Sequence, residues 1–316
     1  MKLPWNDYSG RLSPLKLTVF VALFLPVAWT AGEGVSGMLG ARPLTEAIHQ
    51  QGLWTIRLIL IALAITPLKA VLYWQRLILV RRMIGVAAFG YILLHFTLYI
   101  ADENFNLPTA ATEIVKRIYL TIGFTALCGL AALAATSTDK MVRRLGRKWQ
   151  MLHRLVYVIC ALGLIHYSMQ SKLEQWEPTI ADGIFVWLMG YRLLAWKFAV
   201  RGRLPLGWVA GLGVVATVLA GFGEALYFNL AFHAPLERVL LADFSLQTGV
   251  RPAVVVFAFS VVVLAAGLAR DYLVPPVRRR PRFRLEPVRS SALAPPRKLA
   301  AGAEGGTMCC RACSSR

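Results

Sequence analysis

Apolar residues along the chain gather in eight long runs separated by shorter polar segments. Each run is about 17–26 residues long, and a helix rising about 1.5 Å per residue needs about 20 residues to cross a hydrocarbon layer. A backbone surrounded by lipid has to satisfy its own hydrogen bonds, so the runs are expected to be helices. The pattern predicts an all-α, polytopic membrane helix bundle with spans at 15–31, 53–74, 83–101, 118–136, 149–169, 179–200, 206–231 and 250–270.

The runs also indicate how the chain is organised. Residues 1–204 hold six spans joined by short loops, and Pro205 precedes two further apolar spans within 205–273. Residues 274–316 are rich in Pro, Arg and small side chains with little to bury, which is typical of a disordered segment. We therefore expect a six-helix core at 1–204, two additional C-terminal transmembrane helices at 205–273 and a disordered basic tail. No internal repeat is evident from the sequence.

The first span has a second interpretation. Lys2, Arg11 and Lys16 precede the apolar stretch 17–31, and this arrangement is also found in cleaved signal peptides. We favour retention as a transmembrane helix. The chain that follows keeps the same orientation in either case.

Charge placement predicts the orientation in the membrane. The chain is 57% hydrophobic and 16% charged with a net charge of +19, a basic excess that often indicates nucleic-acid binding. If the N-terminus is cytoplasmic and the spans alternate, however, 28 of the 35 Lys and Arg residues lie inside and 11 of the 16 acidic residues lie outside. Cytoplasmic loops of membrane proteins carry this basic excess. The charge therefore predicts cytoplasmic N- and C-termini and gives little reason to expect a nucleic-acid partner.

The five cysteines do not suggest a disulfide framework. Cys128 and Cys160 lie within spans, where the thiol acts as a small apolar group. Cys309, Cys310 and Cys313 lie in the tail, on the predicted reducing side, and lack a fourth ligand for a metal site.

Two histidines lie at similar depth in separate spans. His95 is near the outer end of the third span and His166 is near the outer end of the fifth, and both spans are predicted to run outward. A titratable side chain inside a membrane usually has a partner or a function. Two imidazoles on separate helices predict axial ligation of a haem iron, although each ring can instead be a satisfied packing residue.

A second pair of residues repeats this spacing on the inner side. His153 lies 13 residues before His166, and Arg82 lies 13 residues before His95. On one straight helix, 13 residues span about 20 Å and turn the side chains apart, so His153 and His166 would not ligate one iron. His153 is a candidate ligand of a second haem or a contact for a propionate, and Arg82 is suited to a carboxylate but not to iron. The number of haems, one or two, stays open.

Three other residues are weaker candidates. His49 precedes the second span and is either an ordinary loop histidine or part of a site near the outer end. His233 follows the seventh span and suggests no function. Glu224 is an acid within the seventh span, which by default indicates function, but it lies near an end where it can reach water.

The motifs around these histidines resemble the MsrQ family, also called YedZ, within the ferric-reductase-like transmembrane superfamily. The resemblance covers roughly 15–204. It is carried by Leu63-Ala64-Ile65-Thr66-Pro67-Leu68, by Arg81-Arg82-Met83-Ile84-Gly85 before Leu94-His95-Phe96-Thr97-Leu98-Tyr99, by Thr136-Ser137-Thr138, and by Leu145 to Tyr157 (LGRKWQMLHRLVY) followed by Ile165-His166-Tyr167.

The resemblance implies a bacterial inner-membrane subunit that binds haem b and transfers electrons without reducing the final substrate itself. It implies the quinol pool as donor and MsrP, a periplasmic molybdopterin enzyme that reduces methionine sulfoxide in oxidised proteins, as acceptor. FMN is also attributed to the family, but no residue here indicates its site. His95, His153 and His166 match the family's haem-associated histidines. With Arg82 from the repeated spacing they are the expected cofactor-binding residues, and their common depth favours His95 and His166 as the axial pair.

The chain departs from the family by its two additional spans and its tail. The tail is too short for the cytoplasmic flavin and nucleotide domain of related reductases, so electrons are expected from a membrane quinol or from a separate flavin reductase. Two other functions stay open: a membrane component of a ferric or other metal reductase, and a transporter or structural membrane protein without haem.

Overall fold

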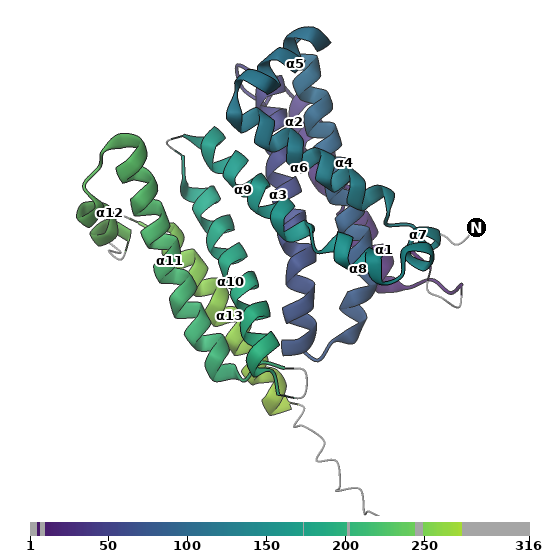
Figure 1. Cartoon of the computed structure of the whole chain (residues 1–316), viewed down its shortest axis with the longest axis vertical. Coiled ribbons are helices and arrows are strands. Elements are labelled where there is room, and N and C mark those ends of the chain that lie inside the picture. The colour runs from purple at the N-terminus through teal and green to yellow at the C-terminus, as the bar shows by residue number, and fades with distance from the viewer. Residues whose placement is uncertain (1–4, 7–9, 173, 201–202, 244–248, 274–316) are drawn as a thin grey trace, which may run out of the picture. The chain divides into compact units, whose positions relative to one another are not determined.

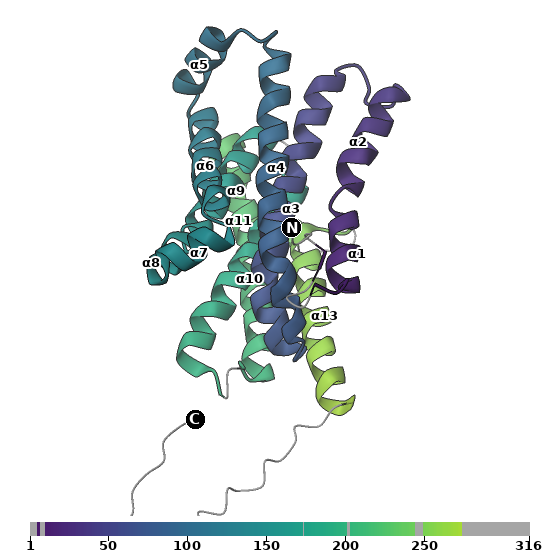
Figure 2. The same cartoon turned by 90° about the vertical axis from the view of Figure 1, so that its right-hand side faces the viewer.

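The computed structural model describes residues 5–6, 10–172, 174–200, 203–243 and 249–273, and nearly all of these lie in helices (Figures 1 and 2). Within these ranges no strand longer than an isolated bridge occurs, so the all-α prediction is confirmed. Seven helical segments there are long and apolar enough to cross a membrane. They are Pro14–Val35, Pro43–Val71, Gln75–Asp102, Ile118–Ala135, Arg147–Ser171, Leu206–Phe232 and Pro252–Leu273.

The remaining predicted span, 179–200, forms α10 (Trp176–Phe198). Its 23 residues extend about 34 Å at about 1.5 Å per residue, enough to cross a bilayer. Its four charged residues, Glu177, Asp182, Arg192 and Lys197, are spread along the helix, whereas those of Gln75–Asp102 lie near its ends. Two of these, Glu177 and Asp182, belong to sites described below.

Two of the predicted spans are broken helices. The first consists of α1 (Pro14–Ala22) and α2 (Leu25–Val35), and Figure 2 shows them end to end along one edge of the bundle. Pro26 lies in the first turn of α2, where a backbone N–H would have no partner within the helix, so proline is tolerated. Proline inside a continuous helix would remove a hydrogen bond, so α1 does not continue through it. The fifth span consists of α8 (Arg147–His153) and α9 (Val156–Ser171), separated by Arg154 and Leu155.

The break between α8 and α9 corrects the assumption of a straight helix through His153 and His166. The amides of Arg154 and Leu155 donate to the carbonyls of Met151 and Leu152, three residues earlier, at 3.2 and 3.0 Å. This tighter 3₁₀ pattern interrupts the α-helical ladder. The angle between the two histidines is therefore set by the break and not by a count of 100° per residue.

Helix α3 (Pro43–Val71) lies at the centre of the bundle. In its most apolar stretch 56% of the residues are buried, against 22% in α4 (Ile78–Asp102). It packs against α4, α9 and α10, and a helix that is apolar all round is expected to be buried in this way. It begins ten residues before the predicted span, so His49 lies on a helix and not in a loop.

Short helices that the span pattern did not predict connect the long ones. They are η1 (Gln75–Leu77), α5 (Leu107–Lys116), α7 (Asp139–Leu145) and α12 (Leu236–Asp243). Side-chain caps begin two of them: Asn106 accepts from the amide of Thr109 at 3.2 Å, and Thr138 accepts from the amide of Met141 at 3.3 Å. Such caps satisfy amides that lack a partner in the first turn.

The two additional helices, α11 (Leu206–Phe232) and α13 (Pro252–Leu273), pack on each other and on α10. Arg203 joins them to the rest of the bundle, because its guanidinium donates to Asp271 of α13 at 2.6 Å and to the hydroxyl of Tyr73 at 3.0 Å. The predicted tail at 274–316, with Cys309, Cys310 and Cys313, lies outside the described residues.

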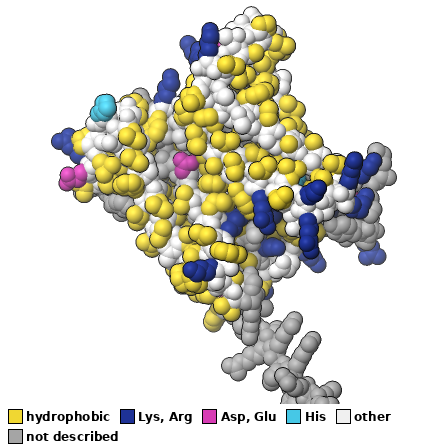
Figure 3. All heavy atoms as spheres, in the orientation of Figure 1, with side chains coloured by type: hydrophobic (Ala, Val, Ile, Leu, Met, Phe, Trp, Pro, Cys, Tyr) yellow, Lys and Arg dark blue, Asp and Glu magenta, His cyan; other side chains and the backbone are white. Residues whose placement is uncertain are grey.

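Exposed side chains on the bundle are largely apolar. Figure 3 shows hydrophobic side chains over most of one face, with basic side chains gathered near α7 and α8. An exposed apolar surface of this extent is expected for a bundle surrounded by lipid. The basic residues at α7 and α8 are among those the charge pattern assigned to an inner loop: Lys140, Arg143, Arg144, Arg147 and Lys148.

Candidate functional site

His95 on α4 and His166 on α9 lie close together. Their ring centroids are 6.3 Å apart and the ring planes are nearly perpendicular, at 89°. The sequence placed these imidazoles at similar depth in two separate spans, and the structure brings the two rings together between the helices. The same α-helix, α4, also carries Arg82, 13 residues before His95.

Each ring is fixed by one hydrogen bond to a backbone carbonyl on the preceding long helix. Nδ1 of His95 lies 2.7 Å from the carbonyl oxygen of Ile48, and Nδ1 of His166 lies 2.8 Å from that of Tyr119. A carbonyl only accepts, so Nδ1 carries the proton and donates in both rings. The lone pair of each neutral imidazole is therefore on Nε2, which is the nitrogen available to a metal.

A glycine makes room for each ring. A Cβ atom at Gly52 on α3 would lie 3.0 Å from Nδ1 of His95, and one at Gly123 on α6 (Ile118–Ala135) would lie 2.8 Å from Nδ1 of His166. Both distances are shorter than ordinary van der Waals contact. Each glycine lies four residues after the carbonyl that its histidine contacts, so the missing side chain opens access to that carbonyl. Sequence reasoning did not identify Gly52 or Gly123.

The two halves of the site repeat with a constant shift of 71 residues. This shift relates His95 to His166 and Gly52 to Gly123, and it also relates Ile48 to Tyr119. The same shift relates Arg82 to His153. Each of these residues lies 13 positions before the histidine of its own half, His95 or His166, as the sequence already indicated. No internal repeat was evident from the sequence because the surrounding residues differ. In the structure the repeat is seen as the same histidine–glycine–carbonyl contact made twice.

The separation of the rings suits one metal ion between them. With a metal–nitrogen bond of about 2.0 Å, and about 1.2 Å from nitrogen to ring centre, two imidazoles across one ion have centroids about 6.3–6.4 Å apart. The centroids of His95 and His166 are 6.3 Å apart. Two neutral histidines on facing helices are also the usual axial donors of a haem held in a helix bundle. The residues present therefore fit a bis-histidine haem.

His153 lies apart from this pair, at the end of α8. Its ring stacks on Trp149 with centroids 4.0 Å apart, and its Nε2 lies 3.2 Å from the hydroxyl of Thr136. The indole of Trp149 donates to the carbonyl of Thr136 at 2.9 Å. His153 is thus held between a tryptophan and a threonine.

Arg82 makes an ion pair with Asp139, the first residue of α7. Both side chains are at least half exposed. Since 13 residues of helix span about 20 Å, Arg82 lies far from the ring of His95 along α4. The structure therefore does not bring Arg82 to the pair formed by His95 and His166.

A polar network next to His166 was not found from the sequence. Glu177 of α10 accepts from Arg57 of α3 at 3.2 Å and from the hydroxyl of Tyr167 at 3.1 Å. The Arg57 guanidinium also lies over the Trp54 ring at 5.1 Å. Tyr167 directly follows His166, so this network connects three helices at the level of the pair. The only signal in the sequence was Arg57 inside an apolar run, since Glu177 precedes the run at 179–200.

The weaker candidates fall in different places. His49 is exposed on the first turns of α3, and His233 is exposed at the C-terminal end of α11. Glu224 was expected near water, but its side chain is only 4% exposed. It lines a cavity between α9, α10 and α11 that also contains Asp182.

Comparison with known proteins identifies the family of the chain. Residues 51–164, which hold Gly52, His95, Gly123 and His153, match the family described as ferric reductase like transmembrane component. The chain is 42% identical over 200 residues to the protein-methionine-sulfoxide reductase heme-binding subunit MsrQ of Rhodospirillum rubrum, an alignment that covers 92% of that protein and 63% of this chain. The chain belongs to the MsrQ family.

Further relatives with the same name are similar to the same extent. The MsrQ of Caulobacter vibrioides is 41% identical over 177 residues (84% of that protein, 55% of this chain), and the MsrQ of Herminiimonas arsenicoxydans is 39% identical over 204 residues (94% and 64%). No solved structure matches the chain. The apolar helices and the family together identify a multi-pass membrane protein. Over a third of the chain lies outside each alignment, so it is longer than its MsrQ relatives.

Proposed function

We propose that the chain binds one haem b between His95 and His166 and relays electrons as the membrane subunit of a methionine sulfoxide reductase system. The observation that carries this proposal is the pair of imidazoles 6.3 Å apart, each with Nδ1 bonded to a carbonyl and Nε2 left to a metal. The relatives named as heme-binding subunits support it.

The residues of the site act on position and electrostatics. Ile48 and Tyr119 hold the two rings in one tautomer through their carbonyls, and these bonds make Nε2 more electron-rich. Gly52 and Gly123 let the rings approach those carbonyls. A haem held by His95 and His166 would supply one-electron transfer and would leave no position for a substrate at its iron. The site is therefore suited to electron relay and not to substrate reduction.

Donor, acceptor and orientation follow from the family and the charge pattern. We place the pair on the periplasmic half of a bacterial inner-membrane bundle with cytoplasmic termini, because 28 of 35 basic residues then lie inside. An MsrP-like periplasmic molybdopterin subunit accepts the electrons. The quinol pool supplies them, or a separate flavin reductase does, and FMN enters only through the family. His153 and Arg82 are assigned to the inner half, where Arg82 pairs with the carboxylate of Asp139.

The direct test is an optical spectrum of the purified protein with haem quantified per chain. The wild type is expected to show a six-coordinate b-type spectrum after dithionite reduction, with one haem per chain. His95→Ala and His166→Ala are each expected to abolish that spectrum. His233→Asn is the matched control, because His233 is exposed at a left-handed helix end where asparagine is tolerated. A normal spectrum in both ligand variants would overturn the assignment.

A metal reductase is the second candidate, favoured by the description of the matched family as ferric reductase like. Complementation separates the two functions. Cells that lack their own MsrQ and depend on periplasmic repair of oxidised methionine are expected to grow when this chain and an MsrP-like partner are supplied. Rescue of growth on a ferric chelate, without rescue of methionine sulfoxide repair, would favour the metal reductase.

A further inference from the structure

A cavity of about 330 Å³ lies between α9, α10 and α11. Two of these helices, α9 and α10, belong to the six-helix core, and the third belongs to the extension beyond the expected family region. The cavity therefore exists only because the extension packs against the core. Its volume is at the low end of the range for ligand pockets, about 300–1,000 Å³, so it accommodates a small ring and not a nucleotide.

The cavity has an apolar mouth and a polar floor. Ile165, Met169 and Leu219 line it and are between 39% and 48% exposed on the bundle surface, where lipid would lie. Gln175, Thr179 and Glu224 line it and are at most 6% exposed. Figure 3 shows an acidic side chain visible within the hydrophobic face over these helices. A ligand entering here would come from the membrane.

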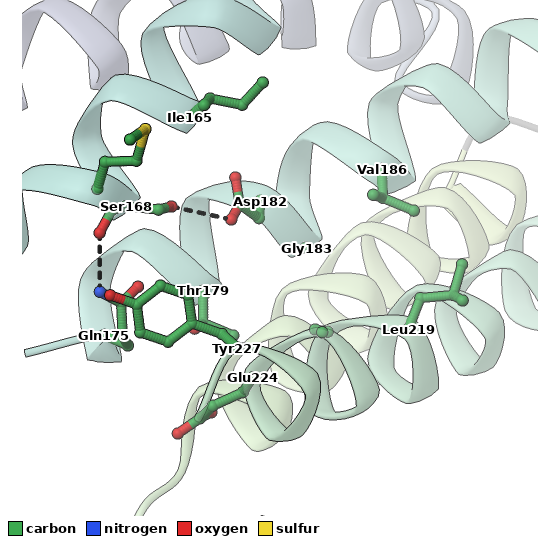
Figure 4. A pocket seen from close by; sticks show the side chains of 13 residues that line it. Ile165, Ser168, Gln175, Thr179, Asp182, Gly183, Val186, Leu219, Glu224 and Tyr227 are labelled. Atoms are coloured by element: carbon green, nitrogen blue, oxygen red, sulfur yellow. Dashed lines mark hydrogen bonds between the residues drawn. The ribbon is translucent and has the colours of Figure 1, made fainter. Parts of the chain in front are cut away.

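Two acids line the floor, one from each part of the chain. Asp182 comes from α10 and accepts from the hydroxyl of Ser168 at 3.4 Å (Figure 4). Glu224 comes from α11 and lies one turn before Tyr227, which also lines the cavity. Carboxyl groups at membrane depth are costly and mark proton or ligand sites by default. Neither acid is used by the site formed by His95 and His166.

The cavity adjoins the proposed iron ligand. Ile165 and Ser168 both line it, and His166 lies between them on the same turn of α9. One face of this turn thus carries the ligand and the other carries the cavity wall. An occupant of the cavity would be separated from the haem by little more than the width of one helix.

The lining selects a class of ligand. A lipid-facing apolar mouth requires an apolar tail, and carboxyl groups at the floor require hydrogen-bond donors, so an anionic lipid headgroup or a nucleotide is disfavoured. Among the described residues no group of three metal-ligating side chains occurs, so a metal ion has little support. A hydroquinone has an apolar tail, a small ring and two hydroxyl donors.

We infer that the cavity between α9, α10 and α11 is the site where a membrane quinol is bound and oxidised, with Asp182 and Glu224 accepting its protons. This inference rests on the proposed function, since the haem next to His166 is the electron acceptor. The quinol loses two electrons, one at a time to the iron, and two protons, one to each carboxylate, and leaves as the quinone. The two electrons suffice to reduce one methionine sulfoxide.

The first test measures binding and reduction separately on the haem-loaded protein, with decylubiquinone and decylubiquinol as probes. Asp182→Asn and Glu224→Gln are each expected to slow haem reduction by decylubiquinol by tenfold or more, while dithionite still reduces the haem fully. Glu237→Gln on α12 is the matched control, because Glu237 is an exposed acid of the extension outside the cavity. The rate of haem reduction by decylubiquinol in this variant is expected to equal that of the wild type.

The second test fills the cavity without changing charge. A Cβ at Gly223, which lines the cavity, meets no atom within 4 Å, and the same holds for Gly211 on the same helix outside the cavity. Gly223→Leu is expected to weaken decylubiquinone binding at least tenfold in calorimetry, and Gly211→Leu is expected to leave it unchanged. Haem reduction by decylubiquinol and decylubiquinone binding at wild-type levels in the Asp182, Glu224 and Gly223 variants would overturn the inference. Loss of the dithionite-reduced spectrum in the wild type would instead overturn the proposed function.

Discussion

The ring of His95 lies directly against Gly52, so that a Cβ atom at this glycine would be 3.0 Å from Nδ1. The same nitrogen donates to the carbonyl of Ile48 one turn earlier on α3. Glycine is thus required here for close approach of a side chain to a helix backbone and not for a turn. The arrangement recurs 71 residues later, where His166 lies against Gly123.

Alanine at Gly52 or at Gly123 is therefore expected to displace the facing imidazole. Overpacking of this kind costs about 1–3 kcal/mol, and each 1.4 kcal/mol is about tenfold in an equilibrium constant. We expect haem to dissociate about tenfold more readily from each variant, measured by transfer of haem to an excess of apomyoglobin. Gly85→Ala on α4 is the control, because a Cβ there meets no atom within 4 Å. Equal haem loss in all three variants would argue against the role of the two glycines.

His153 provides a test of the number of haems. Its ring is held between Trp149 and Thr136. The equivalent position on α4, 71 residues earlier, is Arg82, which is not an iron ligand. We expect His153→Ala to retain one haem per chain with the same six-coordinate spectrum as the wild type. The measurement is a pyridine haemochrome assay against protein concentration. Two haems in the wild type and one in the variant would show that His153 ligates a second iron.

The sequence predicted the helices well because span length and apolar composition are local properties. It also placed His95 and His166 at one depth, since depth follows from position along a span. It could not predict the break between His153 and His166, because the two intervening residues differ little from helix formers. The break depends on how α8 packs, through Trp149 and Thr136, and on the change to i−3 hydrogen bonds.

The supporting residues of the site were harder to predict than its histidines. Gly52 and Gly123 are ordinary small residues in an apolar run until the facing helix is known. The constant interval of 43 residues from each glycine to its histidine was present in the sequence, but nothing marked it as a contact. Glu224 was expected near water because its depth was judged from the end of its span, whereas its side chain is buried.

Glu177 is expected to influence the potential of the haem. Its carboxylate lies next to Arg57 and Tyr167, which follows the ligand His166. A nearby negative charge stabilises the oxidised iron, and Glu177→Gln removes that charge. The midpoint potential is therefore expected to rise by on the order of tens of millivolts. The ion pair is partly exposed, with side chains 42% and 38% accessible, so its loss should cost only about 0–1 kcal/mol.

A spectroelectrochemical titration measures this shift. Glu174→Gln, an exposed acid three residues earlier, removes the same charge farther from the network and is expected to leave the potential unchanged. An equal rise in both variants would show that the effect is a general one of surface charge. A fall in the Glu177 variant would contradict the prediction outright.

Asp271 is expected to anchor the extension. It accepts from Arg203 at 2.6 Å, and the arginine side chain is only 15% exposed. Asp271→Ala would leave a largely buried guanidinium without its carboxylate, a loss of about 1–3 kcal/mol after allowing for the partial exposure of the aspartate. Thermal unfolding in detergent is expected to occur at a lower temperature. Asp139→Ala, in a pair whose side chains are at least half exposed, should cost less than about 1 kcal/mol.

The orientation of the bundle can be tested with two lysines at its opposite ends. Lys116 at the end of α5 and Lys140 in α7 are both exposed, and the charge pattern assigns them to the periplasmic and cytoplasmic sides respectively. In a variant without native cysteines, Lys116→Cys is expected to react with a membrane-impermeant maleimide on intact spheroplasts. Lys140→Cys should react only after the membrane is permeabilised. The reverse pattern would place His95 and His166 on the cytoplasmic half, and a periplasmic partner could then no longer receive electrons directly from their haem.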